Sequence, residues 1–210
     1  MIHYDYYADV PDGAVGDLLT RARLVRLVTY DGRVPHIGLY PFTHDAGGFE
    51  LHLHRKDEQI ADLRSHGVCA IEVDEVLSTI PSHWVDPDNA VFATAYHRTA
   101  VFECDATLTD DAEAIAQQQT RIMARYQPEG GHRPVRDDAM YAGLLRMLVG
   151  VRLAVTATKV KFKLGQNRPF AVRAKLVERL RERGGEGDAR TADALQSTID
   201  LGWDTDGRRR

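Results

Sequence analysis

Hydrophobic and polar residues alternate along several stretches of this chain, in the pattern of half-buried strands. The pattern begins at 24–30, resumes at 34–40 after the hairpin signal Asp31-Gly32, and returns at 49–54. Further strands are predicted at 68–73, 77–85, 91–107 and 149–164. The first of these lacks clean alternation, so we expect it to be buried on both faces. Many strands joined by short turns predict an antiparallel barrel.

Hydrophobic residues at helical spacing predict helices at 11–23, 58–66, 110–126, 137–148 and 171–183. Gly67 is the expected C-cap of the second helix. The expected fold class is therefore mainly β with peripheral helices, an α+β arrangement. We expect a barrel domain at 1–170, a C-terminal helical extension at 171–203 and a disordered tail at 204–210.

One stretch near the C-terminus combines a strand pattern with unusual charge. Lys159, Lys161 and Lys163 alternate with hydrophobic residues, so their side chains share one face of an extended strand. The chain then turns at Gly165 into 166–169, a Gln-Asn-Arg-Pro segment rich in donors. The pattern is typical of a solvated edge strand, where lysines discourage association, and it also suits an anion or cofactor site.

The composition limits which cellular compartment and which kinds of binding partner we expect. The net charge is -4 and the pI about 6.1, so no global basic field favours nucleic acid. Cys69 and Cys104 lie far from any C-x-x-C spacing, which favours a reducing cytoplasm over a disulfide framework. The N-terminus lacks the pattern of a signal peptide, and no apolar run approaches the roughly 20 residues needed to span a bilayer. We expect a cytoplasmic protein without a membrane segment.

Several basic residues could hold a flat, anionic cofactor. FMN needs cations and backbone donors for its phosphate, and apolar walls such as Trp84 for its ring. Arg55 and Lys56 precede the N-terminus of a predicted helix, whose dipole would add positive potential. Further cationic or amide groups come from Lys161, Lys163, Gln166 and Arg168.

The same residues could hold the propionates of haem, which also needs an axial ligand. The chain has nine histidines. His52 and His54 project from one strand face and rank first as iron ligands, followed by His36 and His97. A zinc site at His52, His54 and Glu50 lacks further ligands. The residues alone leave haem b and FMN open.

The order of motifs resembles a known family. Val149-Gly150-Val151, followed by 161–169 with the sequence KFKLGQNRP, resembles the "VGF…GKxKLSQNRP" segment of the PaiB family. That family is described as FMN-binding negative transcriptional regulators and belongs to the FMN-binding split-barrel superfamily. The segments 32–42, 52–59 and 78–84 resemble other motifs of the family. The resemblance implies a homodimeric split barrel that holds its cofactor at the subunit interface and acts on a small molecule.

Departures from the family pattern concern the loops that line the flavin pocket in the superfamily. Leu39 stands where the family has a histidine, and the segment 51–59 keeps His52 but gains His54. Of the family's "PTWNY" segment, 93–97 here, only Thr94 is kept in place. Lost flavin residues and gained histidines favour the haem-using branch of the family over an unchanged FMN site.

That branch, the piperazate synthases, closes N5-hydroxyornithine into a ring by forming an N–N bond. The resemblance then implies a haem-dependent enzyme in which Lys163 and Glu50 manage substrate charge and protons. The cofactor contacts would come from His52, His54, Arg55, Lys56, Trp84, Thr94, His97, Lys161, Gln166, Asn167 and Arg168, with His54 or His52 as the axial ligand of the iron. An FMN-dependent oxidoreductase like pyridoxamine 5'-phosphate oxidase is the alternative.

A transcriptional regulator is the second alternative. It is disfavoured because the sequence has no helix-turn-helix signature and no basic face beyond the helix at 171–183.

Overall fold

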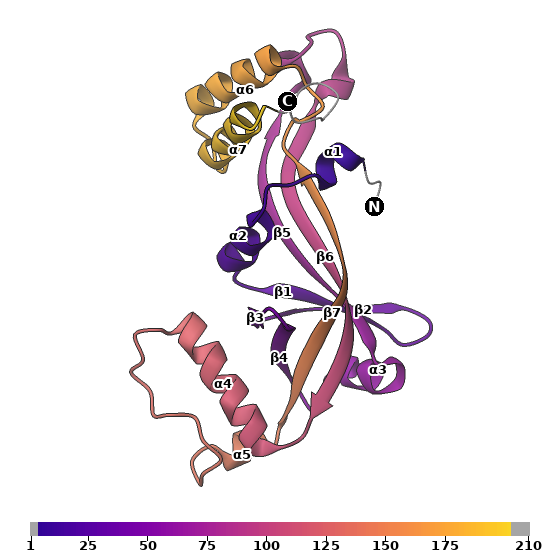
Figure 1. Ribbon diagram of the computed structural model, residues 1–210, viewed down its shortest axis with the longest axis vertical. Coiled ribbons are helices and arrows are strands. Elements are labelled where there is room, and N and C mark those ends of the chain that lie inside the picture. The colour runs from indigo at the N-terminus through magenta and orange to yellow at the C-terminus, as the bar shows by residue number, and fades with distance from the viewer. Residues whose placement is uncertain (1–3, 203–210) are drawn as a thin grey trace. The chain divides into compact units, whose positions relative to one another are not determined.

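A computed structural model describes residues 4–202 of the chain. The tail predicted at 204–210 therefore lies outside the described residues. The strands are β1 (Val25–Tyr30), β2 (Pro35–Tyr40), β3 (Thr43–Asp45), β4 (Gly48–His54), β5 (Val68–Ile80), β6 (Thr94–Thr109) and β7 (Leu148–Lys163). The helices are α1 (Asp5–Ala8), α2 (Ala14–Arg21), α3 (Glu58–His66), α4 (Ala112–Tyr126), α5 (Ala142–Leu145), α6 (Phe170–Arg183) and α7 (Asp188–Asp200), with short 3-10 turns η1 (Ser82–Trp84) and η2 (Ala90–Phe92) (Figure 1).

The strands form one seven-stranded sheet in the order β2-β1-β5-β6-β7-β4-β3. The pairs with a defined register are antiparallel: β1 with β2 and β5, and β4 with β3 and β7. His52 lies opposite Gly150, and Glu50 lies opposite Arg152. The expected class is therefore confirmed: an antiparallel β architecture with helices around it, of the α+β kind.

The chain divides into two compact units, and the three long strands β5, β6 and β7 contribute to both. Unit 1 contains the residues up to 22, 74–100 and those from 159 onward. Unit 2 contains 23–73 and 101–158. Helices α6 and α7, both in unit 1, pack against each other (Figure 1).

The core of unit 2 forms where β4 and β7 turn their hydrophobic faces inward. Phe49, Leu51 and Leu53 are almost fully buried, so the other side chains of β4 face the opposite way, as the alternation predicts. Helix α4 packs against β4, and its Gln118 Nε2 donates to the carbonyl of Val151 at 3.0 Å. Two other α4 side chains, Gln119 and Arg121, contact His52 and Glu50 on the polar face of β4.

Several predicted boundaries are confirmed by local chemistry. Helix α3 begins after Asp57, whose carboxylate accepts from the backbone of Gln59 at 3.0 Å. It ends at Gly67, which has a φ of 68° as a left-handed C-cap requires. The lysine strand is continuous with the strand before it, forming the 16-residue β7.

Three predictions are wrong. The helix expected at 137–148 is only the four-residue α5, because 127–141 forms a polar, turn-rich loop. The strands expected at 68–73 and 77–85 are one strand, β5, because half-buried Asp74 and Glu75 continue the sheet instead of turning the chain. The start of β5 is not buried on both faces: Ile71 and Val73 are buried, whereas Val68 is 55% exposed.

Candidate functional site

The end of β7 carries a group of cations in unit 1. We call Lys161, Lys163 and Arg168 the basic cluster. All three residues are half-buried. The ammonium of Lys163 donates to the hydroxyl of Thr94 on β6, and the Lys161 ammonium lies 5.9 Å from the ring centre of Tyr7. Strand alternation produces this arrangement, because Phe162 and Leu164 are buried on the other face of β7.

The cations of the basic cluster lie close enough to perturb one another. Burial, then the charges of Lys161 and Arg168, lower the pKa of Lys163 from its ordinary value. Among the described residues, no carboxylate forms an ion pair with any of the three. Partly desolvated like charges without a counterion are unfavourable, and a bound anion would relieve them.

His97 lies beside the basic cluster. Burial, and then the charges of Lys161 and Lys163, lower its pKa, and Asp74 opposes the shift only in part. Its Nδ1 is 3.1 Å from the Thr99 hydroxyl. The imidazole is therefore held in its neutral form, which is the form that binds metals.

Aromatic side chains surround the cations of unit 1. The guanidinium of Arg168 stacks on Phe92 at 4.5 Å from the ring centre. Tyr7 and Tyr96 are buried, and burial raises the pKa of each to about 12. Trp84 is half-buried in η1, with the guanidinium of Arg183 at 4.8 Å from its ring.

Gln166 and Asn167 form the turn that follows β7. Gln166 is fully buried; its Nε2 donates to the Phe162 carbonyl at 2.6 Å and its Oε1 accepts from the Leu164 backbone at 2.8 Å. The preceding Gly165 has a φ of 79°, which a residue with a side chain rarely adopts. Both polar atoms of Gln166 are thus used in shaping the turn that presents Arg168, while Asn167 is half-buried beside it.

The second group of predicted residues lies on β4 in unit 2. Glu50 is held by two guanidinium groups: Arg121 Nε approaches its carboxylate to 2.6 Å and Arg152 Nη1 to 3.3 Å. His52 Nδ1 lies 2.6 Å from the side-chain amide of Gln119 on α4, and burial lowers the pKa of His52.

The residues after His52 form the turn between β4 and α3. His54 Nδ1 accepts from the backbone N–H of Lys56 at 3.1 Å, so the proton of its neutral ring is on Nε2. Arg55 is anchored by Asp110 at 2.5 Å and by the Arg146 carbonyl at 3.1 Å, and Lys56 is exposed. The predicted residues thus divide between the two units, and Trp84 of unit 1 lies against Arg183.

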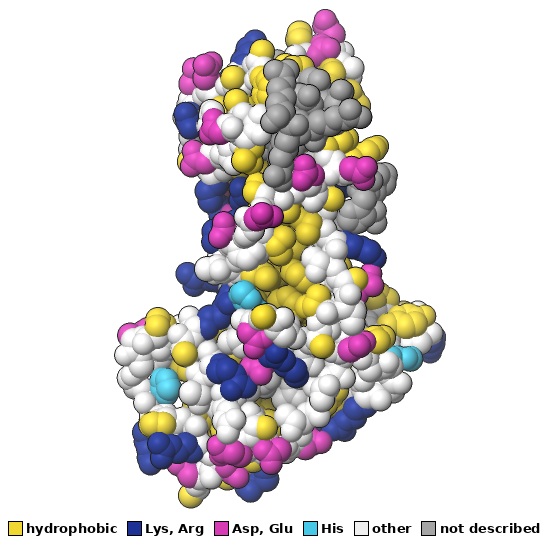
Figure 2. Space-filling view, viewed as in Figure 1, with side chains coloured by type: hydrophobic (Ala, Val, Ile, Leu, Met, Phe, Trp, Pro, Cys, Tyr) yellow, Lys and Arg dark blue, Asp and Glu magenta, His cyan; other side chains and the backbone are white. Residues whose placement is uncertain are grey.

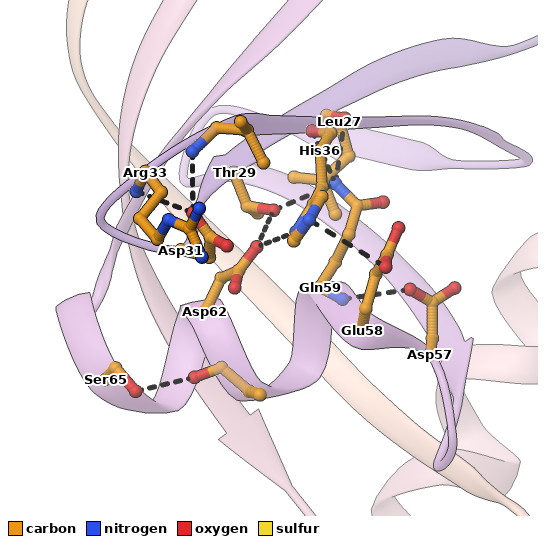
Figure 3. Close-up of polar contacts among 12 residues, drawn as sticks. Leu27, Thr29, Asp31, Arg33, His36, Asp57, Glu58, Gln59, Asp62 and Ser65 are labelled. Atoms are coloured by element: carbon orange, nitrogen blue, oxygen red, sulfur yellow. Dashed lines mark hydrogen bonds and ion pairs between the residues drawn. The ribbon is translucent and has the colours of Figure 1, made fainter.

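Sequence reasoning missed a polar network beneath the β1–β2 hairpin, drawn in Figure 3. Asp62 of α3 is buried, and its Oδ2 accepts from the Thr29 hydroxyl at 2.6 Å and from His36 Nδ1 at 2.8 Å. The other ring nitrogen of His36 lies 3.8 Å from Glu58 (Figure 3). The hydrogen bond to Asp62 raises the pKa of His36.

The network connects the hairpin to α3. Gln59, also buried, donates to the Leu27 carbonyl at 3.0 Å and to Thr29 at 3.1 Å. The only signal in the sequence was helical spacing: Asp62 lies three residues after Gln59, on the same face of a helix whose hydrophobic side is buried.

Unit 1 also contains a cavity of about 230 Å³ on the Phe162 and Leu164 face of β7, opposite the lysines. Its wall includes Arg21 and Arg98, which both pair with Glu75, at 3.2 and 2.5 Å. Within residues 4–202 there is no group of three or more histidine, cysteine, aspartate or glutamate side chains that could hold a metal ion. That finding concerns ion sites and does not bear on haem, which needs a single protein ligand.

On the face drawn in Figure 2, acidic and basic side chains lie interspersed, and neither sign forms a continuous patch there. None of the helices within residues 4–202 is long and apolar enough to cross a membrane.

The antiparallel sheet and its helices define a protein of the FMN-binding split-barrel class. Residues 1–157 match the family model described as "Putative FMN-binding domain", and the chain belongs to that family. No curated protein matches the chain.

Solved structures show the same fold at low sequence identity. The flavocytochrome Anf3 from Azotobacter vinelandii is similar with a TM-score of 0.63 and 15% identity, over 77% of this chain and 72% of that one. The FAD and heme binding protein from Mycobacterium smegmatis has a TM-score of 0.60 and 12% identity, over 73% and 71%. The conserved hypothetical protein Rv2991 from Mycobacterium tuberculosis has a TM-score of 0.55 and 20% identity, over 76% and 90%.

Proposed function

We propose that this chain binds a flat, anionic redox cofactor through the basic cluster and uses it to transform a small molecule. The observation that carries the proposal is the set of three partly desolvated cations without a carboxylate partner among the described residues, one of them with a lowered pKa. The phosphate of FMN and the propionates of haem are both anions that could pair with these cations. Family membership supports a flavin, and two of the similar structures are a flavocytochrome and a heme-binding protein by name.

Haem b is our first candidate, because a neutral imidazole lies among the cations. His97 would supply the axial nitrogen while Lys161 and Lys163 receive the propionates. His54 suits the ligand role less well: a backbone N–H can only donate, so the Nδ1 lone pair is occupied and Nε2 carries the proton. His52 offers Nε2 only if Gln119 presents its oxygen to a protonated Nδ1, an arrangement common behind metal-bound histidines.

FMN is the second candidate, favoured by the family to which residues 1–157 belong. Its phosphate would contact Lys163 and Arg168, and the Thr94 hydroxyl would complete the donor set. Phe92, already stacked on Arg168, would lie near the flavin end of the site. Flavin-dependent redox chemistry on a small molecule would follow, as in the pyridoxamine 5'-phosphate oxidase class.

For haem, the proposed reaction is an N–N bond-forming cyclisation of an N-hydroxylated diamino acid, as the resemblance to piperazate synthases implies. Bound iron would supply Lewis acidity toward the hydroxylamine oxygen, so that water can leave. A neighbouring base would take the proton of the attacking α-amine, and Lys163, as an ammonium, would manage the charge of the substrate. Glu50 is already neutralised by two guanidinium groups, and we give it no part in the proton transfer.

We also propose that the protein acts as a homodimer with the cofactor between subunits. Ile37 and Leu39 support an interface: they are 63% and 57% exposed on β2, a strand at the edge of the sheet. Light scattering with size exclusion should give twice the 23.5 kDa chain mass. Ile37→Lys with Leu39→Lys should give monomers, and a monomeric parent protein would reject this part of the proposal.

A regulator of transcription has less support from the described residues. In the basic helix α6, Arg173 is fully buried and donates to Thr198 at 2.7 Å, so it cannot face DNA. Binding of duplex DNA that weakens steeply with salt would restore that alternative.

The absorption spectrum of purified protein titrated with hemin or with FMN tests the proposal. We expect saturable binding of one of them, with a Soret band or flavin bands. Lys163→Met should weaken binding about 10- to 100-fold, the effect of losing one charge-assisted hydrogen bond. Lys175→Met, which removes an exposed lysine of α6 in the same unit, is the matched control and should bind normally.

The histidine variants separate the two cofactors. With haem, His97→Ala should abolish the ferric Soret position of the parent, and His54→Ala should leave it unchanged. With FMN, neither variant should alter the flavin bands by more than a small shift. Failure of both cofactors to bind, or equal binding by Lys163→Met and the parent protein, would reject the basic cluster as the site.

A further inference from the structure

The two cysteines of the chain lie together in unit 2, on neighbouring strands. Ala106 of β6 donates its backbone N–H to the carbonyl of Gly67, just before β5, at 2.8 Å. Counting two residues along each antiparallel strand places Cys69 opposite Cys104. Ile71 and Val73, two and four residues after Cys69, are buried, as are Ala100 and Phe102 on the side of Cys104. Both thiols therefore belong to the inner face of the sheet.

The distance between the strands suits a covalent bond between these cysteines. Residues opposite each other in a hydrogen-bonded antiparallel pair have Cα atoms about 5.5 Å apart. Disulfides span Cα separations of about 4.4–6.8 Å, so the backbone would not need to move far. The two thiols interact: this contact lowers the pKa of Cys104, and the same contact, together with burial, raises the pKa of Cys69. Cys104 is therefore the sulfur that loses its proton first, with the S–H of Cys69 beside it.

A small molecule can reach the pair. Cys69 and Cys104 both line a cavity of about 400 Å³ in unit 2, together with Val28, Tyr30 and Thr156. Cys69 is half-buried and Cys104 almost fully buried, so Cys69 forms the more open part of the wall. The cavity is large enough for a hydroperoxide.

We propose that Cys69 and Cys104 are a reactive dithiol site that reduces hydroperoxides and closes into a cross-strand disulfide. A thiolate attacks the terminal oxygen of hydrogen peroxide, giving a sulfenic acid and, after protonation of the leaving hydroxide, one water. The second thiol attacks the sulfenic sulfur, forms the S–S bond and releases a second water. Two thiols are oxidised, one peroxide is reduced, and thiol reductants restore the starting state.

The site requires nothing from the proposed cofactor. The disulfide would close a loop of 35 residue steps and tie β5 to β6 across the wall of the cavity. Because it restricts the unfolded chain, it should raise the melting temperature by about 5 °C or more.

The test uses full-length protein, reduced and then treated with a small excess of hydrogen peroxide. We expect the intact mass to fall by about 2 Da, and thiols titrated after unfolding to fall from two to none. A tryptic peptide joining the two cysteines should appear, and dithiothreitol should reverse all three changes. The chain should remain unlinked to other copies on a non-reducing gel.

Single variants distinguish a dithiol site from two independent thiols. Cys69→Ser and Cys104→Ser should each form no disulfide, and in Cys69→Ser dimedone should trap a sulfenic acid on Cys104. If either variant fails to fold, the parent protein still gives a test: its remaining thiols are alkylated at intervals during peroxide treatment. In a dithiol site, Cys69 and Cys104 should become resistant to alkylation at the same rate. Two thiols that persist under peroxide, or that are consumed with a mass gain and no loss of 2 Da, would overturn the proposal.

Discussion

Asp188 is expected to be the most important single carboxylate for the stability of unit 1. It is the first residue of α7 and has no exposed surface. Its two oxygens accept from Arg183 Nε at 2.7 Å and Nη2 at 2.5 Å, from the Ser78 hydroxyl at 2.6 Å and from the Gly185 backbone at 2.8 Å. This one side chain connects the end of α6, the start of α7 and strand β5.

The expected loss follows from these four bonds. Asp188→Asn keeps the shape but removes the charge and turns one acceptor into a donor. Each charge-assisted bond contributes roughly 1.5–3 kcal/mol when its partners are buried. The Arg183 side chain is 35% exposed and can be hydrated, so we discount its two bonds and expect a loss of about 3 kcal/mol in the free energy of unfolding.

The same helix offers a matched control. Asp193 pairs with Arg181 at 3.5 Å, but its side chain is 75% exposed. Asp193→Asn should change the unfolding free energy by no more than about 0.5 kcal/mol. Urea unfolding followed by circular dichroism at pH 7 measures both variants against the parent protein.

The pH dependence gives a second check. The Arg183 guanidinium, with help from Ser78, holds the pKa of Asp188 well below its usual range. A depressed pKa means that this stabilisation is present above the unfolded pKa of about 3.9 and disappears as the pH falls below it. The difference in unfolding free energy between Asp188→Asn and the parent protein should therefore shrink below about pH 4. A loss under 1 kcal/mol at pH 7, or one equal to that of Asp193→Asn, would refute the reasoning.

Three further predictions follow from other parts of the structure. The raised pKa of His36 means that its contribution is present below the unfolded value of about 6.5 and is lost as the pH rises through the folded one. His36→Gln should thus lower the melting temperature more at pH 5.5 than at pH 8.5; an equal effect would contradict the ion pair. Gly48 has a φ of 123°, and a Cβ there would lie 1.9 Å from a backbone oxygen of β7, so Gly48→Ala should cost about 3 kcal/mol or more in urea. Gly13→Ala, at a φ of 81° in open space, should lower the free energy of unfolding by only about 1–2 kcal/mol. Equal losses in the two variants would show that backbone strain, and not the steric clash at Gly48, causes the destabilisation. Raising the salt concentration should weaken cofactor binding to the parent protein more than to Lys163→Met; identical salt slopes would exclude Lys163 from the anion contacts.

Local periodicity predicted most of the secondary structure correctly. Alternation correctly separated the hydrophobic and polar residues of β4 onto opposite faces, and helix signals at Asp57 and Gly67 located α3. These features depend on neighbours within a few residues, so one stretch of sequence contains the information. The helix predicted at 137–148 is wrong although Leu145 packs against Ile115 and Ala116 of α4. The carboxylate of Asp138 accepts from the backbone N–H groups of Met140 and Tyr141 and holds this part of the segment in a turn.

The sequence by itself determined the strand pattern, the position of the lysine strand and the residue types suited to an anionic cofactor. Only the tertiary structure decided which of those residues meet. It brought Thr94, His97 and Lys163 together from β6 and β7, and it placed Glu50 between two arginines. It also opposed Cys69 to Cys104 and buried Asp62 beneath His36. Such encounters depend on strand order and register across tens of residues, and these arise when the whole sheet packs its hydrophobic face.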